Sequence, residues 1–522
     1  MSASTTLRLG TRRSALAWVQ SSQVAQALRD AHPGLAIELV GIETRGDRIQ
    51  DVPLSGVEGK EFFTAEIDTA LREARVDLTV HSLKDLSLER PAAFTLAAIP
   101  KRANPRDIAI FAPDALERLK GGHGLRIGTA SPRRQQLLPA FFANALPYAP
   151  HNRIELLPLR GNVDSRLKRL REPRGSERQL DGVVLALAGL TRLFADTVTE
   201  RQGRKLLGDV LAGLPLMVLP LTDCPAAPGQ GALAIECRSD DARTRGLLAA
   251  LEHPPTRAAI TAERAVLAEY GGGCHQRFGA TQLDVAGGLL LQIGGLASND
   301  TDISGRRWLP NVVPPALPAK VVAFDGTQVT APATRPLLDA AGLRATLQGD
   351  AVFLAHSRAL PAGGAAALEG RRVWTSGSAS WFRLAEQGVW VEGCAEGRGA
   401  DLAAQLIAEP VLRLPAAAQW TVLTHAGAES GWQDGAWRGA QVAASYQSTD
   451  AGALDVQALA AATHVYWSSV AQFDHGRSHV SPSAQHSSGA GKTAEHIRRA
   501  GIANFTAFPS VYEWQQWTAK AP

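Results

Sequence analysis

The sequence is poor in cysteine and has no long apolar run. Its 522 residues include four cysteines and no CxxC pair, too few for the disulfide framework of a secreted protein, so we expect a reducing, cytoplasmic setting. The absence of a run of about 18 apolar residues excludes a transmembrane helix. The first residues, MSASTTLRLGTRRSA, lack the apolar core of a secretory signal. Hydrophobic residues at 45% and charged residues at 20% argue against disorder.

Positive and negative side chains nearly balance, with 54 Lys and Arg against 50 Asp and Glu. The net charge is +4, too weak to indicate a nucleic-acid or membrane partner, and we expect neither. All but two of the 11 tryptophans, Trp18 and Trp308, follow residue 370, so the two parts of the chain differ in composition. The length alone predicts roughly three to four domains.

The first 240 residues alternate short apolar segments with amphipathic ones. We expect helices after Ser14 and over 61–74, and strands over 7–11, 36–42, 77–83, 107–112, 125–129, 154–159 and 182–190. This alternation predicts an α/β fold with open, mostly parallel sheets. In such sheets ligands bind at the carboxyl ends of the strands.

The rest of the chain divides into three segments. A Pro- and Gly-rich segment over 213–236 predicts a crossover, followed by a helix over 257–270 and β structure to about residue 310. A Pro-rich linker then leads to a second α/β unit, with strands near 321–324, 351–355, 372–376, 420–424, 441–446 and 464–469. The Ser- and Gly-rich stretch 481–492 predicts a surface loop.

Arginines gather at the predicted strand ends of the first half. They are Arg12, Arg133, Arg134, Arg160 and Arg166. A guanidinium fork recognises carboxylates bidentately, and a helix N-terminus adds positive potential, so the pattern predicts a site for a polyanion. The alternative is that these arginines are solvated surface charges.

Two further positions could carry chemistry. Asp85 follows Lys84 at a strand end, where an ionised carboxylate can stabilise a cationic intermediate or move a proton. The alternative for Asp85 is a helix cap or a structural ion pair. Cys274 follows three glycines that permit an exposed loop, so its thiol could be reactive; the alternative is a small buried hydrophobe.

Motifs in the first half resemble the hydroxymethylbilane synthase (porphobilinogen deaminase) family. They are LRLGTRRSALAWVQ, HSLKDL, KRANPRD, GTASPRRQQLL, LRGNVDSRLKRL, LALAGLTRL, PGQGALAIECR and GGGC. The resemblance implies two lobes like those of periplasmic binding proteins, domain 1 over 1–106 and 213–236 and domain 2 over 107–212. It also implies a small α+β domain 3 over 237–310, then a linker over 311–320.

The resemblance also implies an activity. The family joins four porphobilinogen molecules head to tail and releases ammonia at each step, on a dipyrromethane cofactor that Cys274 would hold covalently. Asp85 falls on the catalytic aspartate, which stabilises positive charge on the pyrrole nitrogen. The positions that bind the cofactor in the family correspond to Lys84, Asp85, Ser131, Arg133 and Arg134. The positions that bind the substrate correspond to Arg12, Ser14, Lys60, Arg160 and Arg166. No metal is expected.

The second half resembles the uroporphyrinogen-III synthase family. The similar segments are TSGSASWFRLAEQGVWVEG, RGAQVAASYQ, VYWSSVAQF and GAGKTAEHIRRAGI. The resemblance implies a two-lobed α/β unit over 321–522 that closes hydroxymethylbilane into a ring with loss of water. Tyr446 would be the acid, and the substrate-binding residues would be Ser376, Ser468, Ser469, Lys492 and Thr493.

The whole sequence therefore predicts a monomeric bifunctional enzyme of tetrapyrrole biosynthesis. Its substrates would be porphobilinogen and hydroxymethylbilane. One alternative makes the second half a non-catalytic regulatory or interaction domain. Another makes the protein a solute-binding protein, against which the lack of a signal peptide and the presence of Cys274 argue.

Overall fold

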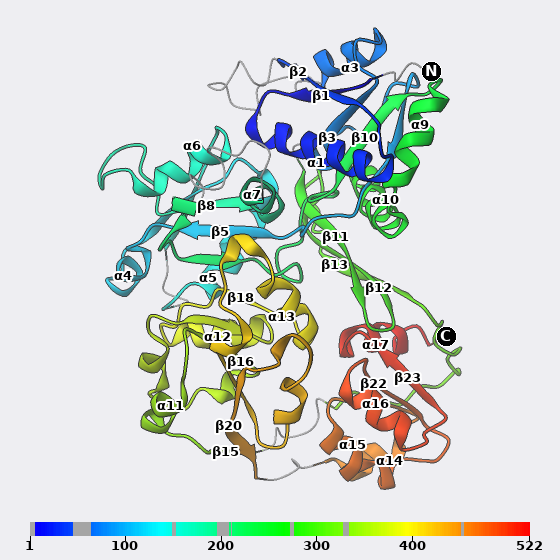
Figure 1. Ribbon diagram of the computed structural model, residues 1–522. Helices are drawn as coiled ribbons and strands as arrows, with labels where there is room; N and C mark the ends of the chain where they lie inside the picture. The colour runs from blue at the N-terminus through cyan, green and yellow to red at the C-terminus, as the bar shows by residue number, and fades with distance from the viewer. Residues whose placement is uncertain are drawn as a thin grey trace.

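The computed structural model describes residues 6–44, 64–148, 153–195, 208–209, 211–271, 276–326, 333–449 and 454–521. Helices and sheets alternate throughout, which confirms a mixed α/β fold (Figure 1). The strands of the described residues form five sheets, here named A to E. No helix in these ranges combines the length and hydrophobicity needed to span a membrane.

Sheet A has the order β2-β1-β3-β10-β4, and β10 runs antiparallel to its neighbours. Its strands are β1 (Leu7–Arg12), β2 (Ile37–Ile42), β3 (Leu78–Ser82), β4 (Phe94–Ala98) and β10 (Leu233–Arg238). Helix α1 (Ala15–Ala31) begins at the N-cap Ser14 and packs Val24 and Leu28 onto one face, while α3 (Ala65–Arg72) covers the other (Figure 1). The nearby α9 spans Ala242–Leu248.

Sheet B has the order β7-β6-β8-β5-β9, with β5 antiparallel to both of its neighbours. Its strands are β5 (Asp107–Phe111), β6 (Leu125–Gly128), β7 (Ile154–Leu157), β8 (Gly182–Ala186) and β9 (Leu216–Val218). Its helices are α4 (Ala115–Lys120), α5 (Pro132–Ala145), α6 (Val163–Lys168) and α7 (Leu187–Phe194). The chain passes between sheets A and B twice, over 99–106 and over 219–232.

Sheet C is a three-stranded antiparallel sheet that joins the two halves. It consists of β11 (Arg277–Val285), β12 (Gly288–Leu296) and β13 (Gly305–Pro310), and α10 (Pro254–Glu269) packs on β11. Its far end reaches the last lobe of the chain, where Trp308 packs on Phe508 with ring centroids 5.0 Å apart (Figure 1).

Sheets D and E, with their helices, make up what we name the C-terminal unit. Sheet E has the order β15-β20-β19-β16-β17-β18: β15 (Thr334–Pro336), β16 (Ala351–Leu354), β17 (Arg372–Thr375), β18 (Gly393–Cys394), β19 (Trp420–His425) and β20 (Gln441–Ser448). All its pairs are parallel except β15 with β20. Its helices are α11 (Ala340–Thr346), α12 (Ser378–Glu386) and α13 (Ala400–Ile407).

Sheet D is wholly parallel. Its strand β14 comes before sheet E in the chain, and its other three strands come after sheet E. Its order is β14 (Ala323–Phe324), β21 (His464–Trp467), β22 (Gln485–Gly489) and β23 (Phe505–Phe508). Its helices are α14 (Val456–Ala461), α15 (Val470–Gly476), α16 (Lys492–Arg499) and α17 (Val511–Thr518). The C-terminal unit therefore has two lobes, because the chain starts in sheet D, builds sheet E and returns.

The two halves of the molecule share hydrophobic cores. Trp381 of α12 is fully buried against Phe141 of α5, with ring centroids 5.4 Å apart, and its Nε1 donates to Ala145 O at 2.9 Å. Trp390 packs edge-on against Phe111 of β5 at 5.0 Å. Sheet B and sheet E thus bury apolar surface against each other, and in Figure 1 the yellow-green to gold lobe that contains α12 and β16 lies directly below sheet B.

The sheets of the first half are mostly parallel, as expected: among their described strands, β10 in sheet A and β5 in sheet B alone run antiparallel to the others. Two other sequence expectations were wrong. The segment 182–190 is not one strand, because β8 ends at Ala186 and α7 begins at Leu187. The stretch 481–492 is not a surface loop: Gln485–Gly489 is an inner strand of sheet D, with His486, Ser487 and Ser488 buried.

Candidate functional site

A polar cluster lies where sheets A and B meet. Lys84 and Asp85 follow β3, Asp107 begins β5, and Gln230 lies in the second crossover. Lys84 Nζ donates to Gln230 Oε1 at 3.2 Å, and Gln230 Nε2 donates to Asp107 Oδ1 at 2.8 Å. Gln230 is 1% exposed and therefore ties the end of β3 to the start of β5 within the protein.

Asp107 holds two of the arginines assigned to ligand carboxylates. Arg133 Nη2 donates to Asp107 Oδ2 at 2.6 Å and Arg134 Nη2 donates to Oδ1 at 2.7 Å. Burial would raise the pKa of Asp107, but the two guanidinium groups outweigh it and hold that pKa well below its usual range. Each Nη1 donates to a backbone carbonyl, Pro225 O and Val184 O respectively, at 2.9 Å. Neither arginine is a solvated surface charge.

The cluster nevertheless contains arginine nitrogens without a hydrogen-bond partner within the described ranges. Nε of Arg133, Nε of Arg134 and Nη2 of Arg160 are buried and have no hydrogen-bond partner in the described part of the chain. Burial, with Arg134 and Arg160 adding to it, lowers the pKa of Arg166 to about 10. Buried donors without acceptors cost free energy unless an anion meets them. The arrangement fits a ligand with several carboxylates.

The two serines assigned to this site are helix N-caps. Ser14 Oγ accepts from Ala17 N and Ser131 Oγ accepts from Arg134 N, each at 3.4 Å. Each hydroxyl can still donate to an anion at its helix N-terminus. Arg12 closes β1, next to Arg13 and Ser14. These positions agree with the expected placement at strand ends.

Lys84 and Asp85 have contrasting surroundings. Asp85 is exposed, whereas the Lys84 side chain is inside the cluster. Burial lowers the pKa of Lys84 below its usual value; Asp85 opposes this shift and Arg134 adds to it. Asp85 is thus an accessible carboxylate beside a set of fixed positive charges, which can act on a proton or a cation in the neighbouring space.

Lys60 and Cys274, which the sequence predicts for substrate binding and cofactor attachment, lie outside the described residues. The other three cysteines are free and buried. Burial raises the pKa of Cys237 to about 11 and the pKa of Cys224 further above its usual value, so neither is a reactive thiolate.

Asp107, Gln230 and Arg192 also belong to this site, although they were not predicted from the sequence. Arg192 donates to Gly231 O at 2.6 Å, and burial lowers its pKa to about 10. The signal for all three was in the motifs KRANPRD, PGQG and LTRL. Gly229 has φ of 80°, and a Cβ there would approach Leu83 Cδ2 to 2.5 Å, so the loop that carries Gln230 requires glycine.

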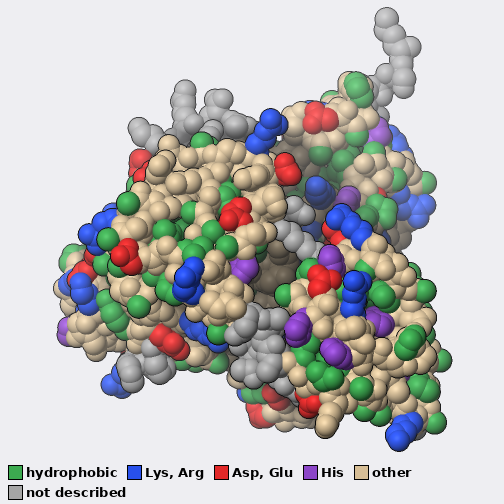
Figure 2. Space-filling model, turned by 90° about the horizontal axis from the view of Figure 1, so that it is seen from below, with side chains coloured by type: hydrophobic (Ala, Val, Ile, Leu, Met, Phe, Trp, Pro, Cys, Tyr) green, Lys and Arg blue, Asp and Glu red, His purple; other side chains and the backbone are tan. Residues whose placement is uncertain are grey.

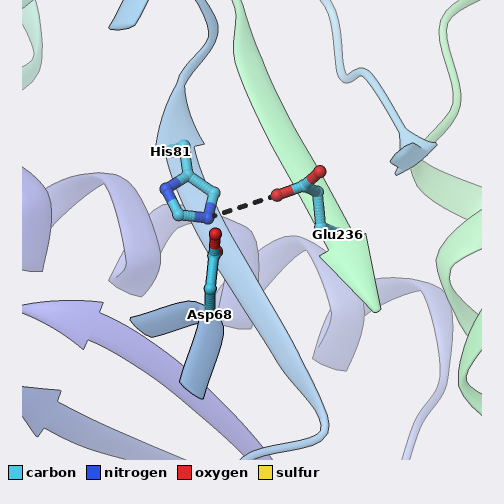
Figure 3. A group of neighbouring side chains, drawn as sticks. All are labelled: Asp68, His81 and Glu236. Atoms are coloured by element: carbon cyan, nitrogen blue, oxygen red, sulfur yellow. Dashed lines mark ion pairs between the residues drawn. The ribbon is translucent and has the colours of Figure 1, made fainter. Parts of the chain in front are cut away.

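A second buried cluster lies between α3 and strands β3 and β10 of sheet A (Figure 3). Asp68, His81 and Glu236 point toward one another, and Arg90 Nη2 donates to Asp68 at 2.7 Å and to Glu236 at 2.8 Å. Burial, together with the charge of Arg90, lowers the pKa of His81 to about 4. At neutral pH the 3.5 Å contact from His81 to Glu236 therefore involves an uncharged imidazole. Arg90 forms an ion pair with each of the two carboxylates, and we interpret the cluster as a structural ion-pair network.

In the C-terminal unit, assigned residues follow the strands of sheet E. Tyr446 lies near the end of β20, with its ring 5.3 Å from that of His425 and 6.3 Å from that of His356. Burial raises the pKa of Tyr446. Ser376 follows β17, and its backbone N–H donates to Leu354 O at 3.1 Å. The two histidines were not assigned, although each stands at the end of a predicted strand.

The other assigned residues belong to sheet D. Ser468 follows β21 and donates to Gln472 Oε1 at 2.9 Å, and Ser469 caps α15 by accepting from Gln472 N at 3.2 Å. Thr493 is in the first turn of α16. The side chain of Lys492 lies outside the described residues. Figure 2 shows a hollow between the two lobes of the C-terminal unit, so residues of both sheets can border one space.

Known proteins match the N-terminal half of the chain, which carries the arginine cluster. Residues 7–246 match the family described as "Porphobilinogen deaminase, dipyromethane cofactor binding domain". The porphobilinogen deaminase of Roseiflexus castenholzii is 44% identical over 293 residues, 56% of this chain and 86% of that protein. The enzyme of Syntrophotalea carbinolica is 41% identical over 297 residues, 57% of this chain and 84% of that protein.

Solved structures resemble this chain only weakly. The BenM effector-binding domain with benzoate has a TM-score of 0.25 and 17% identity, and covers 51% of this chain and 93% of that one. A Candida albicans protein described as having the generic periplasmic binding protein fold has a TM-score of 0.24 and 12% identity, and covers 47% and 67%. Neither likeness defines the fold. On the sequence comparisons and the arginine cluster, the chain belongs to the porphobilinogen deaminase family.

Proposed function

We propose that the N-terminal half joins four porphobilinogen molecules head to tail into hydroxymethylbilane and releases ammonia at each step. Buried arginine nitrogens without partners, beside the exposed carboxylate of Asp85, carry this proposal. Sheet A with its helices would be domain 1, sheet B domain 2, and sheet C with α10 the cofactor-attachment domain. The segment 213–236 was expected to belong to domain 1, but its residues 216–218 form β9 and pair with β5, so they would go with domain 2 instead.

The arginines would bind the substrate's side chains. Each pyrrole of porphobilinogen carries an acetate and a propionate, so the growing chain is a polycarboxylate. Arg134 and Arg160 are close enough to Arg166 to lower its pKa, and the cost of burying these guanidinium groups falls when carboxylates arrive. Arg12, Ser14 and Lys60 would complete the contacts.

Asp85 would carry the proton chemistry. Departure of ammonia leaves positive charge on the pyrrole nitrogen, which an ionised carboxylate in a preorganised site stabilises. The same carboxylate can take the proton released when the new carbon–carbon bond forms. When bound, the dipyrromethane cofactor, attached through Cys274, supplies the end to which the first substrate is joined. Lys84, Ser131, Arg133 and Arg134 would hold its carboxylates.

We further propose that the C-terminal unit closes hydroxymethylbilane to uroporphyrinogen III. Burial keeps the Tyr446 phenol protonated, so it can donate a proton to the departing hydroxyl. Ser376, Ser468, Ser469, Lys492 and Thr493 would bind the propionates from the two lobes, and closing them on the linear chain would bring its ends together. The alternative is a non-catalytic regulatory or interaction unit.

One experiment tests both halves. The full chain is incubated with porphobilinogen, released ammonia is measured, and the uroporphyrinogen isomers are separated after oxidation. Ammonia and the III isomer are the expected result. Ammonia with the I isomer, the product of spontaneous closure, would mean that the C-terminal unit does not catalyse. No ammonia would overturn the deaminase proposal itself.

A variant of Asp85 sharpens the first outcome. Asp85→Asn should retain the dipyrromethane mass on Cys274, yet release ammonia about 10²-fold more slowly or worse, because it loses the proton carrier. Asp240→Asn, which changes an exposed aspartate elsewhere, is the matched control and should keep the wild-type rate. Wild-type turnover in Asp85→Asn would exclude the catalytic role.

A further inference from the structure

The two crossovers between sheets A and B lie against the C-terminal unit. The first ends at Arg106, immediately before Asp107 of β5, and the second passes through Leu221. The crossovers are also joined to sheet B, because Leu219 N donates to Asp107 O and Leu187 N donates to Arg106 O, both at 2.9 Å. Connecting segments of this kind are where two lobes bend relative to each other.

One carboxylate of the C-terminal unit binds both crossovers. Glu396 Oε1 accepts from Arg106 Nε at 2.7 Å and from Leu221 N at 3.0 Å, and Arg106 Nη2 lies 2.6 Å from the same oxygen. Glu396 and Arg106 are 290 residues apart in the chain. The side chain of Glu396 is 0% exposed and that of Arg106 is 6% exposed, so the pair is shielded from water and salt.

The loop that carries Glu396 is held in an unusual conformation. Glu396 has φ of 52°, a left-handed backbone that a residue with a Cβ rarely adopts. Gly397 N donates to Ser376 O at 2.7 Å, and Arg398 Nη2 donates to Asp284 O of β11. The loop therefore contacts the crossovers, sheet C and the end of β17. Strain of this kind persists only where the surroundings impose it, and it often marks functional positions.

The ion pair between Glu396 and Arg106 lies next to Asp107, the residue that binds Arg133 and Arg134. Asp107 follows Arg106 and holds Arg133, Arg134 and Gln230, which in turn accepts from Lys84. A shift of the Arg106 backbone must move Asp107, and with it the arginines of sheet B relative to Asp85 of sheet A. Misplacement of catalytic groups by about 1 Å can cost 10²-fold in rate.

We propose that Glu396 of the C-terminal unit is a positioning residue for the deaminase reaction. It joins the two crossovers and so sets the distance between Asp85 on sheet A and the arginines on sheet B. The proposal rests on the deaminase activity of the N-terminal half and is independent of cyclisation. It gives the C-terminal unit a role in the first reaction even if it catalyses nothing.

The test compares Glu396→Gln with Glu396→Asp in the full chain. The rate of ammonia release is measured against porphobilinogen concentration. We expect Glu396→Gln to raise KM about fivefold and to lower kcat together with it, because loosening a hinge changes both. A loss of correctly folded protein would instead lower kcat and leave KM unchanged. Glu396→Asp keeps the charge and should recover part of the loss.

The matched control is Glu392→Gln. Glu392 is a buried glutamate four residues earlier, and its side chain pairs with Arg372 inside the C-terminal unit. The Glu392→Gln variant should leave KM within about twofold of wild type, since the Glu392 carboxylate does not touch the crossovers. An unchanged KM in Glu396→Gln, or an equal shift in Glu392→Gln, overturns the inference. Absence of ammonia release from the wild-type chain would instead refute the proposed function.

Discussion

At the scale of single residues, buried charges decide how this molecule is built. Asp107 is an acceptor for three side chains, and Glu396 is the acceptor for two crossovers. Buried carboxylates of this kind are costly to take out of water and persist because each meets cationic or N–H donors. Removing either partner leaves the other charge buried, so these positions should tolerate little substitution.

His81 makes stability depend on pH. Its pKa is about 4 in the folded protein, against an ordinary value near 6.5. Between these two pH values the imidazole is therefore protonated in the unfolded chain and neutral in the folded chain. Stability is therefore complete above about pH 6.5 and falls as pH drops toward 4, by up to about 3 kcal/mol. We expect hydrogen exchange of the β3 amides to speed up across this window.

A histidine elsewhere provides the comparison. In His81→Asn the pH dependence of β3 exchange between 6.5 and 4 should flatten, whereas in His123→Asn, which replaces an exposed histidine, it should remain. If His81→Asn keeps the full pH dependence, another group is responsible.

At the scale of elements, β22 shows how composition can mislead. Its residues are polar and small, yet the strand lies between β21 and β23 with three residues buried. His486 is stabilised there, because Trp467 Nε1 donates to its Nδ1 at 3.0 Å. Ser487 Oγ, in contrast, is buried and has no hydrogen-bond partner among the described residues.

These neighbours should respond oppositely to truncation. His486→Ala leaves the Trp467 donor unpaired and should lower the free energy of unfolding by about 1–3 kcal/mol. Ser487→Ala removes an unpaired hydroxyl and should change it by less than about 1 kcal/mol, toward greater stability. Denaturant unfolding followed by tryptophan fluorescence measures both. A loss in Ser487→Ala as large as in His486→Ala would show that the hydroxyl has a partner in solution.

At the scale of the whole molecule, the two halves pack against each other and are not independent domains joined only by a linker. Trp381 belongs to the C-terminal unit but contacts α5, and Val218 N of β9 donates to Glu392 O at 2.7 Å. Unfolding of one half must therefore expose apolar surface of the other.

Trp381→Ala should reveal this coupling. It removes a fully buried indole and should cost about 3–5 kcal/mol. We expect hydrogen exchange to accelerate in α5 and β5 of the N-terminal half. Trp467→Ala, an equally buried tryptophan inside sheet D, should leave α5 and β5 protected. Equal protection of α5 in both variants would mean that the halves are energetically separate.

Much of the fold follows from local patterns. Apolar segments of four to seven residues placed most of the predicted strands within two residues of their observed ends, because burial on a sheet requires such segments. The start of α7 was missed since LALAGL is apolar in either state, and β22 was missed since burial of Ser and His depends on neighbours far away in the chain.

The sequence by itself determined the family, the strand ends that carry Lys84, Asp85 and the arginines, and the division into two compositionally different parts. Local motifs are sufficient for this, because the residues that bind one ligand follow neighbouring strands. Only the tertiary structure decided that Asp107 anchors Arg133 and Arg134, and that Glu396 meets Arg106 from 290 residues away. Such pairs depend on how whole sheets pack, and no spacing in the chain encodes that distance.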